Sequence, residues 1–213
     1  ISMAHRGVLF LDEFPEFPRH VLESLRQPIE DGIVTISRAV GTVTYPAKFV
    51  LIAASNPCHC GYLGDRVKNC RCLPGQISQY KKRISGPILD RIDLHIDLPP
   101  VTPEKLTGNF ISESSKDVRK RVQKARNLQS KRFAKTDFVC NSDMTARFIK
   151  EKIILSESCL NLLKQAVTAM RFSARTYYRI IKVGRTIADL SGETEVLSSH
   201  IAEALQYRVR DET

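Results

Sequence analysis

The feature that most constrains this chain is a short apolar run that leads directly into two adjacent carboxylates, Asp12 and Glu13, within residues 7–14. A continuous apolar run of this length is typical of a strand buried on both faces of a parallel sheet. Two acids at the end of such a strand are costly unless a ligand needs them. Carboxylates there suit Mg²⁺ on a nucleotide phosphate and a water molecule to be activated. The alternative is a strand that simply continues into a polar loop.

A phosphate loop of the form G-x-x-x-x-G-K-[ST] normally accompanies such a strand and precedes it in the chain. The sequence contains no Gly-Lys pair, and six residues precede Gly7. We therefore expect a C-terminal fragment of a longer protein, without the phosphate loop. By itself, this fragment should neither bind ATP tightly nor hydrolyse it.

Composition narrows the class of protein. The 213 residues carry 33 Lys and Arg against 23 Asp and Glu, a formal net charge of +10. This excess favours a polyanionic partner such as nucleic acid, although a solvated basic surface is the common alternative. No apolar run approaches the roughly 20 residues of a membrane span, and no signal peptide precedes the first strand. We expect a cytoplasmic protein without a membrane partner.

The segment after the acidic strand predicts a helix and a β-hairpin. Apolar residues keep helical spacing over residues 18–30, where Pro28 should bend the last turn. Two β-rich runs, residues 33–36 and 42–45, then predict a hairpin with Arg38 near its tip.

A second buried strand is predicted over residues 49–54, and polar residues up to Asn56 follow it. Ligands of parallel sheets bind beyond the carboxyl ends of the strands. If the two strands are neighbours, Asn56 would orient the water that Glu13 activates. The alternative is an ordinary turn at Asn56 and Pro57.

Four cysteines form the pattern C-x-C-x₉-C-x-C, at Cys58, Cys60, Cys70 and Cys72. Thiolates suit Zn²⁺, and four of them could close a tetrahedral site, for which His59 is an alternative ligand. Reduced free thiols and a disulfide are the competing interpretations, because the one-residue spacing is tighter than the usual C-x₂-C.

Beyond the cysteines, the pattern predicts a polar helix over residues 76–83 and a further strand over residues 94–98. From about residue 108 the β-rich runs stop and helical spacing takes over. The predicted helices span residues 117–132, 143–151, 156–170, 173–190 and 198–208.

The first of these later helices is strongly basic. It contains Lys120, Arg121 and Lys124 among other cations, with Asp117 nearly the only acid nearby. A solvated face is the default interpretation of such a run. Contact with DNA, together with the hairpin residue Arg38, is the alternative, because a phosphate backbone needs only positive charge.

Three segments together resemble the AAA+ ATPases, more closely their magnesium-chelatase-like branch, and within it the bacterial ComM (YifB-type) family. They are residues 5–13 (HRGVLFLDE), 54–58 (ASNPC) and 85–94 (SGPILDRIDL). The resemblance extends over essentially the whole chain. It implies an α/β fold, with a partial AAA+ P-loop-type parallel-sheet core over residues 1–101 and an all-α lid domain over residues 102–213.

The resemblance also implies roles for the residues at the two strand ends. Asp12 would help to hold Mg²⁺, and Glu13 would be the catalytic base of the second acidic motif. Asn56 would be the polar sensor. The hairpin would be the pre-sensor insertion that points into a ring pore in related helicases.

Two arginines acquire roles in the same way. Arg91 would be the arginine finger, which reaches the γ-phosphate bound by a neighbouring subunit. Its competing interpretation is an internal pairing with Asp90 or Asp93. Arg175, in the first turn of a predicted helix, would be the second sensor that reads the γ-phosphate from the lid. The weaker candidates for this second-sensor role are Arg171 and Arg179.

The activity implied by the resemblance is ATP-driven movement on DNA, a branch-migration helicase used in recombination and natural transformation. The intact protein would form a ring, hexameric when bound to ATP, with ATP and Mg²⁺ as cofactors. Three alternatives remain: a magnesium-chelatase-type motor subunit, a non-enzymatic zinc-organised module that binds nucleic acid, and a degenerate ATPase kept for assembly. The cysteines and the basic charge argue against the chelatase motor, which needs neither.

Overall fold

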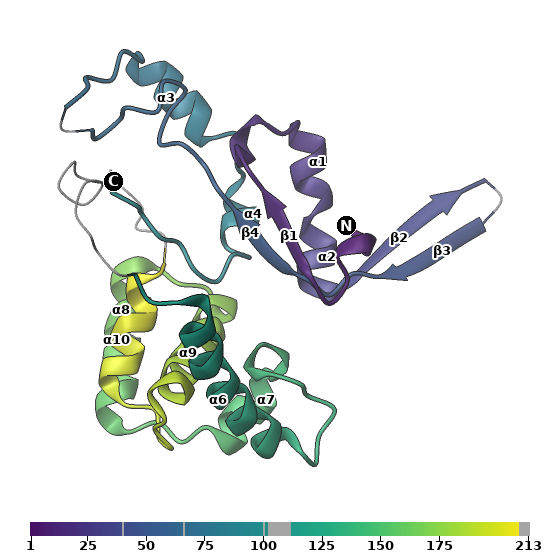
Figure 1. Ribbon diagram of the computed structural model, residues 1–213, viewed down its shortest axis with the longest axis vertical. Helices are drawn as coiled ribbons and strands as arrows, with labels where there is room; N and C mark the ends of the chain where they lie inside the picture. The colour runs from purple at the N-terminus through teal and green to yellow at the C-terminus, as the bar shows by residue number, and fades with distance from the viewer. Residues whose placement is uncertain (40, 66, 100, 102–111, 209–213) are drawn as a thin grey trace. The chain divides into compact units, whose positions relative to one another are not determined.

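The computed structural model describes residues 1–39, 41–65, 67–99, 101 and 112–208. Its contacts divide the chain into two units, Ile1–Ile92 and Asp93–Thr213 (Figure 1). The strands and several short helices belong to the first unit, and the long helices belong to the second. This arrangement confirms the predicted fold, a partial parallel-sheet core followed by a helical lid. The predicted boundary after residue 101 adjoins residues outside the described ranges and stays a prediction.

A two-stranded parallel sheet forms the centre of the first unit. Strand β1 (Val8–Leu11) pairs with β4 (Val50–Ala53), and the ladder ends with Leu11 opposite Ala53. The two predicted strands are therefore neighbours, and their carboxyl ends lie at the same edge of the sheet.

The two faces of this sheet differ in burial. Leu9 and Leu11 pack on a buried cluster that consists of Phe14, Leu22, Leu25 and Ile88. Val8 and Phe10 point to the opposite side, because successive side chains of a strand alternate, and they are 58% and 59% exposed. The prediction of burial on both faces is therefore wrong for the described residues, which cover one face of the sheet.

Two short helices, α1 (Arg19–Ser24) and α2 (Arg26–Asp31), stand where a single helix was predicted. The break lies at Leu25, upstream of Pro28. Proline lacks an N–H and its ring clashes with the carbonyl four residues earlier, so the interruption falls before Pro28 and not in the last turn. Gly32, with a φ of 67°, ends α2 in the left-handed conformation that glycine adopts without strain.

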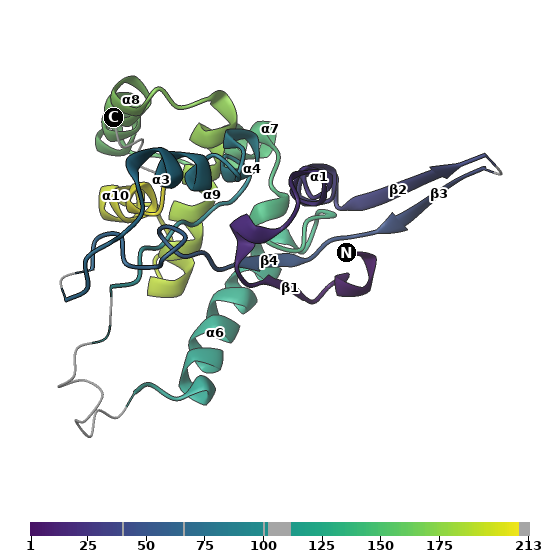
Figure 2. The ribbon, with the colours of Figure 1, turned by 90° about the horizontal axis from the view of Figure 1, so that it is seen from above.

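The predicted hairpin is confirmed. Strands β2 (Ile33–Arg38) and β3 (Gly41–Pro46) pair in antiparallel register, with Arg38 opposite Gly41 at the distal end. The hydroxyl groups of one face pair across the strands, Thr35 with Thr44 at 3.3 Å and Ser37 with Thr42 at 3.1 Å. The hairpin extends away from the rest of its unit (Figures 1 and 2). Arg38 is therefore exposed far from the buried cluster.

The rest of the first unit is a long loop between β4 and α3, together with short helices. These helices are η1 (Ser2–Ala4), η2 (Phe14–Glu16), α3 (Pro74–Lys81) and α4 (Gly86–Leu89). Helix α3 confirms the polar helix expected in this region. The loop before it carries the four clustered cysteines.

The strand predicted over residues 94–98 is wrong for the described chain. Leu94 and Ile96 are 48% and 64% exposed, and no strand of the described residues pairs with this segment. The N–H of His95 instead donates to the carbonyl of Tyr207 at 2.7 Å. An alternating apolar pattern supplies strand propensity, but a strand also needs a neighbour for its backbone.

The second unit is built from helices whose apolar faces meet in one core. The helices are α6 (Ser115–Phe133), α7 (Ala146–Lys152), α8 (Glu157–Met170), α9 (Ala174–Ser191) and α10 (Ser198–Gln206), with a 3₁₀ turn η3 (Asn141–Asp143). The core includes Met144, Leu163, Ile180 and Ile201, which are at most 1% exposed. Hydroxyl groups accept bonds from the first-turn N–H groups of α6 to α9, as is usual for helix caps. These helices confirm the predicted all-helical lid.

Helices α9 and α10 approach each other closely at Gly184. A Cβ atom added there would lie 2.8 Å from Cδ1 of Ile201, so a larger residue would require the end of the Ile201 side chain to shift. None of the helices within the described ranges is long and apolar enough to span a bilayer.

An ion cluster centred on Asp189 lies inside the second unit. The Asp189 side chain has 0% of its surface exposed. Arg132 of α6 donates from Nη1 to Oδ2 at 2.8 Å, and Arg185 donates from Nε to Oδ1 at 3.1 Å. Asn141 and Gln129 donate to Oδ2 at 2.9 Å and 3.4 Å. Burial opposes ionisation of Asp189, but the bonds from Arg132 and Asn141 and the charge of Arg185 outweigh it and lower its pKa.

Candidate functional site

The acidic motif and Asn56 lie at one edge of the sheet, because β1 and β4 both end there. Beyond the last ladder pair, the N–H of Phe14 donates to the carbonyl of Ala54 at 2.8 Å and joins the two chain segments again. Asp12, Glu13 and Asn56 are all exposed at this edge. The structure thus brings these three predicted residues to the same place, and their chemical roles stay predictions.

Glu13 has a strained backbone. Its φ of 50° and ψ of 43° lie in the left-handed region, which costs an L residue roughly 1–2 kcal/mol. The carboxylate of Asp12 accepts the Glu13 N–H at 2.9 Å, and η2 begins directly afterwards. Strain of this kind concentrates at functional sites, where the surrounding structure holds it in place. Sequence reasoning missed it, because a glutamate carries no local signal for a positive φ.

Arg83, two residues after the end of α3, contacts the same region. Its Nη1 donates to Oε2 of Glu16 at 2.5 Å and to the carbonyl of Pro15 at 3.3 Å. A surface hollow of about 450 Å³ lies beside this contact, and the charged residues among those that line it are Arg19, Lys82, Arg83 and Glu16. The hollow is therefore cationic on balance, which suits an anionic group.

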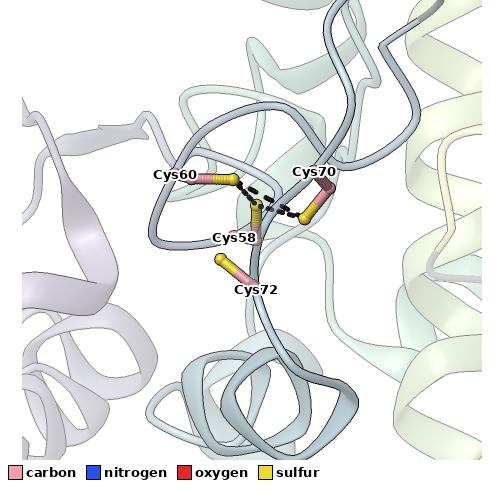
Figure 3. Close-up of side chains that lie close together, drawn as sticks. All are labelled: Cys58, Cys60, Cys70 and Cys72. Atoms are coloured by element: carbon pink, nitrogen blue, oxygen red, sulfur yellow. Dashed lines mark hydrogen bonds between the residues drawn. The ribbon is translucent and has the colours of Figure 1, made fainter.

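Four cysteine sulfurs converge in the loop between β4 and α3 (Figure 3). Sγ of Cys58 lies 3.4 Å from Sγ of Cys60 and 3.7 Å from Sγ of Cys70. With Cys72 included, the four sulfurs lie within 4.8 Å of one another. Cys58 is buried and the other three are partly buried. All four are free thiols, since a disulfide would bring two sulfurs to about 2.05 Å.

These separations fit a tetrahedral metal site. Four sulfurs at about 2.3 Å from a central Zn²⁺ would lie about 3.8 Å apart. Backbone hydrogen bonds from Tyr62 and Arg71 lower the pKa of Cys60 to about 6. A backbone bond from Cys72 favours the Cys70 thiolate, but burial and the neighbouring thiols outweigh it and raise the pKa of Cys70 to about 12. A divalent cation among the sulfurs would stabilise all four thiolates together.

His59, the alternative ligand, lies apart from the four sulfurs. Its ring packs edge-on against Tyr80, with centroids 4.5 Å apart, and its Nδ1 lies 3.7 Å from Oε1 of Glu16. The structure therefore favours an all-cysteine ligand set.

Arg91 follows α4, and its guanidinium is held by a residue that the sequence did not indicate. Nε and Nη2 donate to Oε2 of Glu30 at 3.0 Å and 2.6 Å, and Nη1 donates to the carbonyl of Pro87 at 2.7 Å. Asp93, one of the expected alternative partners, lies 3.1 Å from Arg179. Glu30 was missed because 61 residues separate it from Arg91, and no local pattern connects the two.

The second-sensor candidates lie around the start of α9. Arg175 is exposed in its first turn, after the N-cap Ser173. Arg179 pairs with Asp93, and Arg171 ends α8 in the left-handed conformation with a φ of 49°. A cation at a helix N-terminus opposes the helix dipole, so the position of Arg175 favours an anionic partner.

The candidate DNA contacts in the second unit lie in the exposed N-terminal half of α6. Lys120 pairs with Asp117 at 3.0 Å, and Arg121 pairs with Glu113 at 2.7 Å. Lys124 has no hydrogen bond or ion pair with any part of the chain that the structure describes. Of the three predicted contacts, Lys124 therefore presents its charge most directly to a partner.

Comparison with known proteins adds independent information on both units. The family model described as "Magnesium chelatase, subunit ChlI" matches residues 1–106, and the model of the C-terminal part of the same subunit matches residues 112–208. Competence protein ComM of Haemophilus influenzae is 45% identical over 211 residues, which is 98% of this chain and 40% of ComM. An uncharacterized protein of Escherichia coli, YifB, is 41% identical over 213 residues, 99% of this chain and 41% of YifB.

A more distant similarity extends to a eukaryotic protein. The DNA replication licensing factor mcm-6 of Caenorhabditis briggsae is 24% identical over 216 residues, which cover 97% of this chain and 25% of that protein. The chain spans about two-fifths of the length of the bacterial relatives that it matches.

Proposed function

The chain belongs to the magnesium-chelatase-like family of AAA+ ATPases, in its ComM (YifB-type) branch, and on that premise we propose that it is part of a ring-forming ATPase that couples ATP hydrolysis to DNA remodelling. The observation that carries the proposal is the shared sheet edge, where the in-register ends of β1 and β4 present Asp12, Glu13 and Asn56 together. Such an edge is where parallel sheets bind ligands.

Each residue at this edge has a chemical task in the proposal. When bound with ATP, Mg²⁺ neutralises phosphate charge, and Asp12 supplies a carboxylate of the kind that this ion prefers. Glu13 accepts a proton from the attacking water, and Asn56 orients that water. Arg175 acts from the lid, and Arg91 acts on the phosphate held by the next subunit of a hexameric ring.

DNA is the proposed partner. The similarity to ComM and mcm-6, the net charge of +10 and the cationic hollow support a polyanionic ligand. Arg38 at the hairpin end and Lys124 on α6 are the cations best placed to contact phosphates. We propose branch migration during recombination and natural transformation as the process that uses this motor.

DNA should stimulate ATP hydrolysis by the full-length protein, because a motor couples turnover to movement on its track. The measurement is steady-state ATPase activity with and without branched DNA, with linear duplex as the comparison. The 213-residue chain alone should show no turnover, since its sequence contains no G-x-x-x-x-G-K-[ST] motif. Hydrolysis that ignores DNA would favour the magnesium-chelatase-type motor, which the matching family models also support.

The cysteine cluster should hold one structural Zn²⁺ in the proposed protein. We expect roughly one equivalent of zinc in the purified chain, and near-complete loss of it in Cys60→Ala or Cys72→Ser, because closed structural sites need all four ligands. Metal content by mass spectrometry and the thermal midpoint should fall together. The control is Cys140→Ser, which changes a cysteine outside the cluster and should leave both values unchanged. Four thiols that react readily with a thiol reagent in the native protein would contradict the zinc site.

A further inference from the structure

We infer that Glu30 is a positioning residue for Arg91: it holds the guanidinium in a fixed orientation before the phosphate of the neighbouring subunit arrives. The inference rests on the proposed function, in which Arg91 is the arginine finger. It adds Glu30, a residue of α2 that no sequence motif indicated, as a partner of Arg91.

The guanidinium of Arg91 is hydrogen-bonded at all three of its nitrogens. Two N–H groups of Arg91, on Nε and Nη2, donate to the same oxygen of Glu30, and a third, on Nη1, donates to the carbonyl of Pro87. Bonds from all three guanidinium nitrogens fix both the direction and the plane of this flat group. The Arg91 side chain is 13% exposed and that of Glu30 is 35% exposed, so solvent screens the pair less than it screens a surface ion pair.

Both partners are adjacent in sequence to residues of the buried cluster. Glu30 follows Ile29 in α2, and Arg91 lies between Ile88 and Ile92. All three isoleucines pack in the buried cluster of the first unit, and Ile88 is 0% exposed. Packing of the core therefore sets the distance between the backbones of Glu30 and Arg91 and limits the movement of the ion pair.

An arginine side chain that is ordered before the reaction should stabilise the transition state better than one that is flexible. A long arginine side chain that must be ordered during the reaction loses rotamer freedom at that moment, which weakens its contribution to the transition state. An arginine already held by Glu30 and Pro87 loses less. A positioning partner should therefore affect turnover more than it affects binding of ATP.

The experiment is a double-mutant cycle on the full-length protein, with kcat for ATP hydrolysis and ATP affinity measured for each variant. Glu30→Ala should lower kcat by about 10- to 100-fold and change ATP affinity less than about twofold. The same change made in an Arg91→Ala background should have no further effect, because its target is then absent. Glu30→Gln keeps an oxygen acceptor and should retain part of the rate. The control is Asp31→Asn, which removes the adjacent exposed carboxylate of α2.

A subunit-mixing measurement tests whether Arg91 acts on the ATP that is bound by the neighbouring subunit. Glu30→Ala subunits keep an intact Glu13, and Glu13→Gln subunits keep an intact Glu30–Arg91 pair. Mixed rings should therefore hydrolyse ATP faster than either variant alone.

The possible failures are distinguishable. If Arg91→Ala turns over at the wild-type rate, the proposed finger is wrong. If Arg91→Ala is inactive and Glu30→Ala is fully active, the positioning inference alone is overturned. An equal loss of kcat from Glu30→Ala in both backgrounds would also overturn it, because that result describes a structural role independent of Arg91.

Discussion

Glu13→Gln should reduce kcat for ATP hydrolysis by at least about 100-fold in the full-length protein and leave ATP affinity within about a factor of two. Glutamine has the same shape as glutamate but cannot accept the proton of the attacking water, and a general base of this kind contributes roughly 10²–10⁴ in rate. The exposed position of Glu13 at the carboxyl edge of the sheet allows the substitution without loss of buried contacts. Steady-state hydrolysis and equilibrium binding of a fluorescent ATP analogue measure the two quantities.

The matched control for this substitution is Glu23→Gln. Glu23 is also a carboxylate of the first unit, and it pairs with Arg26 at 2.8 Å on the helices behind the sheet. Its removal should leave kcat unchanged. Wild-type turnover by Glu13→Gln would contradict the assignment of the base. The absence of turnover in the wild-type protein would instead favour a non-enzymatic nucleic-acid module or a degenerate ATPase.

Asp189→Ala should lower the free energy of unfolding of the helical unit by about 3–5 kcal/mol, the usual cost of removing one partner of a buried ion pair. Arg185 has 4% of its side chain exposed, and Arg132 has 23%, so neither can recover full hydration when the carboxylate is lost. The measurement is urea denaturation followed by the helical circular dichroism signal. Asp189→Asn should be intermediate, since it keeps one acceptor oxygen but loses the other and the charge.

The contrast for Asp189 is an exposed pair in the same unit. Arg147 and Glu151 lie 2.8 Å apart on α7 with 87% and 52% of their side chains exposed, and Glu151→Ala should leave stability essentially unchanged.

The lowered pKa of Asp189 also predicts that the stability of the helical unit depends on pH. Its stabilising effect is present above the ordinary pKa of an aspartate and disappears as the pH falls through the lower folded value. A stability equal to that of the wild type in Asp189→Ala would contradict the role of the cluster.

Local patterns were sufficient to predict most elements and to place polar residues directly after two apolar strands. The apolar runs before Asp12 and Asn56 predicted β1 and β4 as strands of a parallel sheet. That the two strands pair with each other was left open by the sequence and is shown by the structure. The hairpin and the lid helices were also predicted, because turn residues, caps and the 3.6-residue period are properties of neighbouring residues. Resemblance to the family suggested the proposed roles of Glu13, Arg91 and Arg175, which no local pattern establishes.

Where sequence reasoning was wrong, the missing information concerned distant parts of the chain. The segment over residues 94–98 has strand propensity but finds no strand partner among the described residues. The face of β1 that carries Val8 and Phe10 is exposed among the described residues. Burial depends on which segments pack against a strand, and an apolar side chain does not specify those segments. The break at Leu25 is different, because it follows from the backbone chemistry of Pro28, and closer local reasoning would have placed it.

The sequence by itself therefore determined most of the elements, their order and the chemical groups at the candidate site. The tertiary structure alone decided which groups meet. Arg91 is held by Glu30 from 61 residues away, and Asp189 is held by Arg132 from 57 residues away. Periodicity and caps are set by interactions within a few residues, whereas the partner of a charged side chain depends on the path of the whole chain. Ion pairs and strand partners of this kind are therefore identified from the tertiary structure, in which distant segments of the chain lie together.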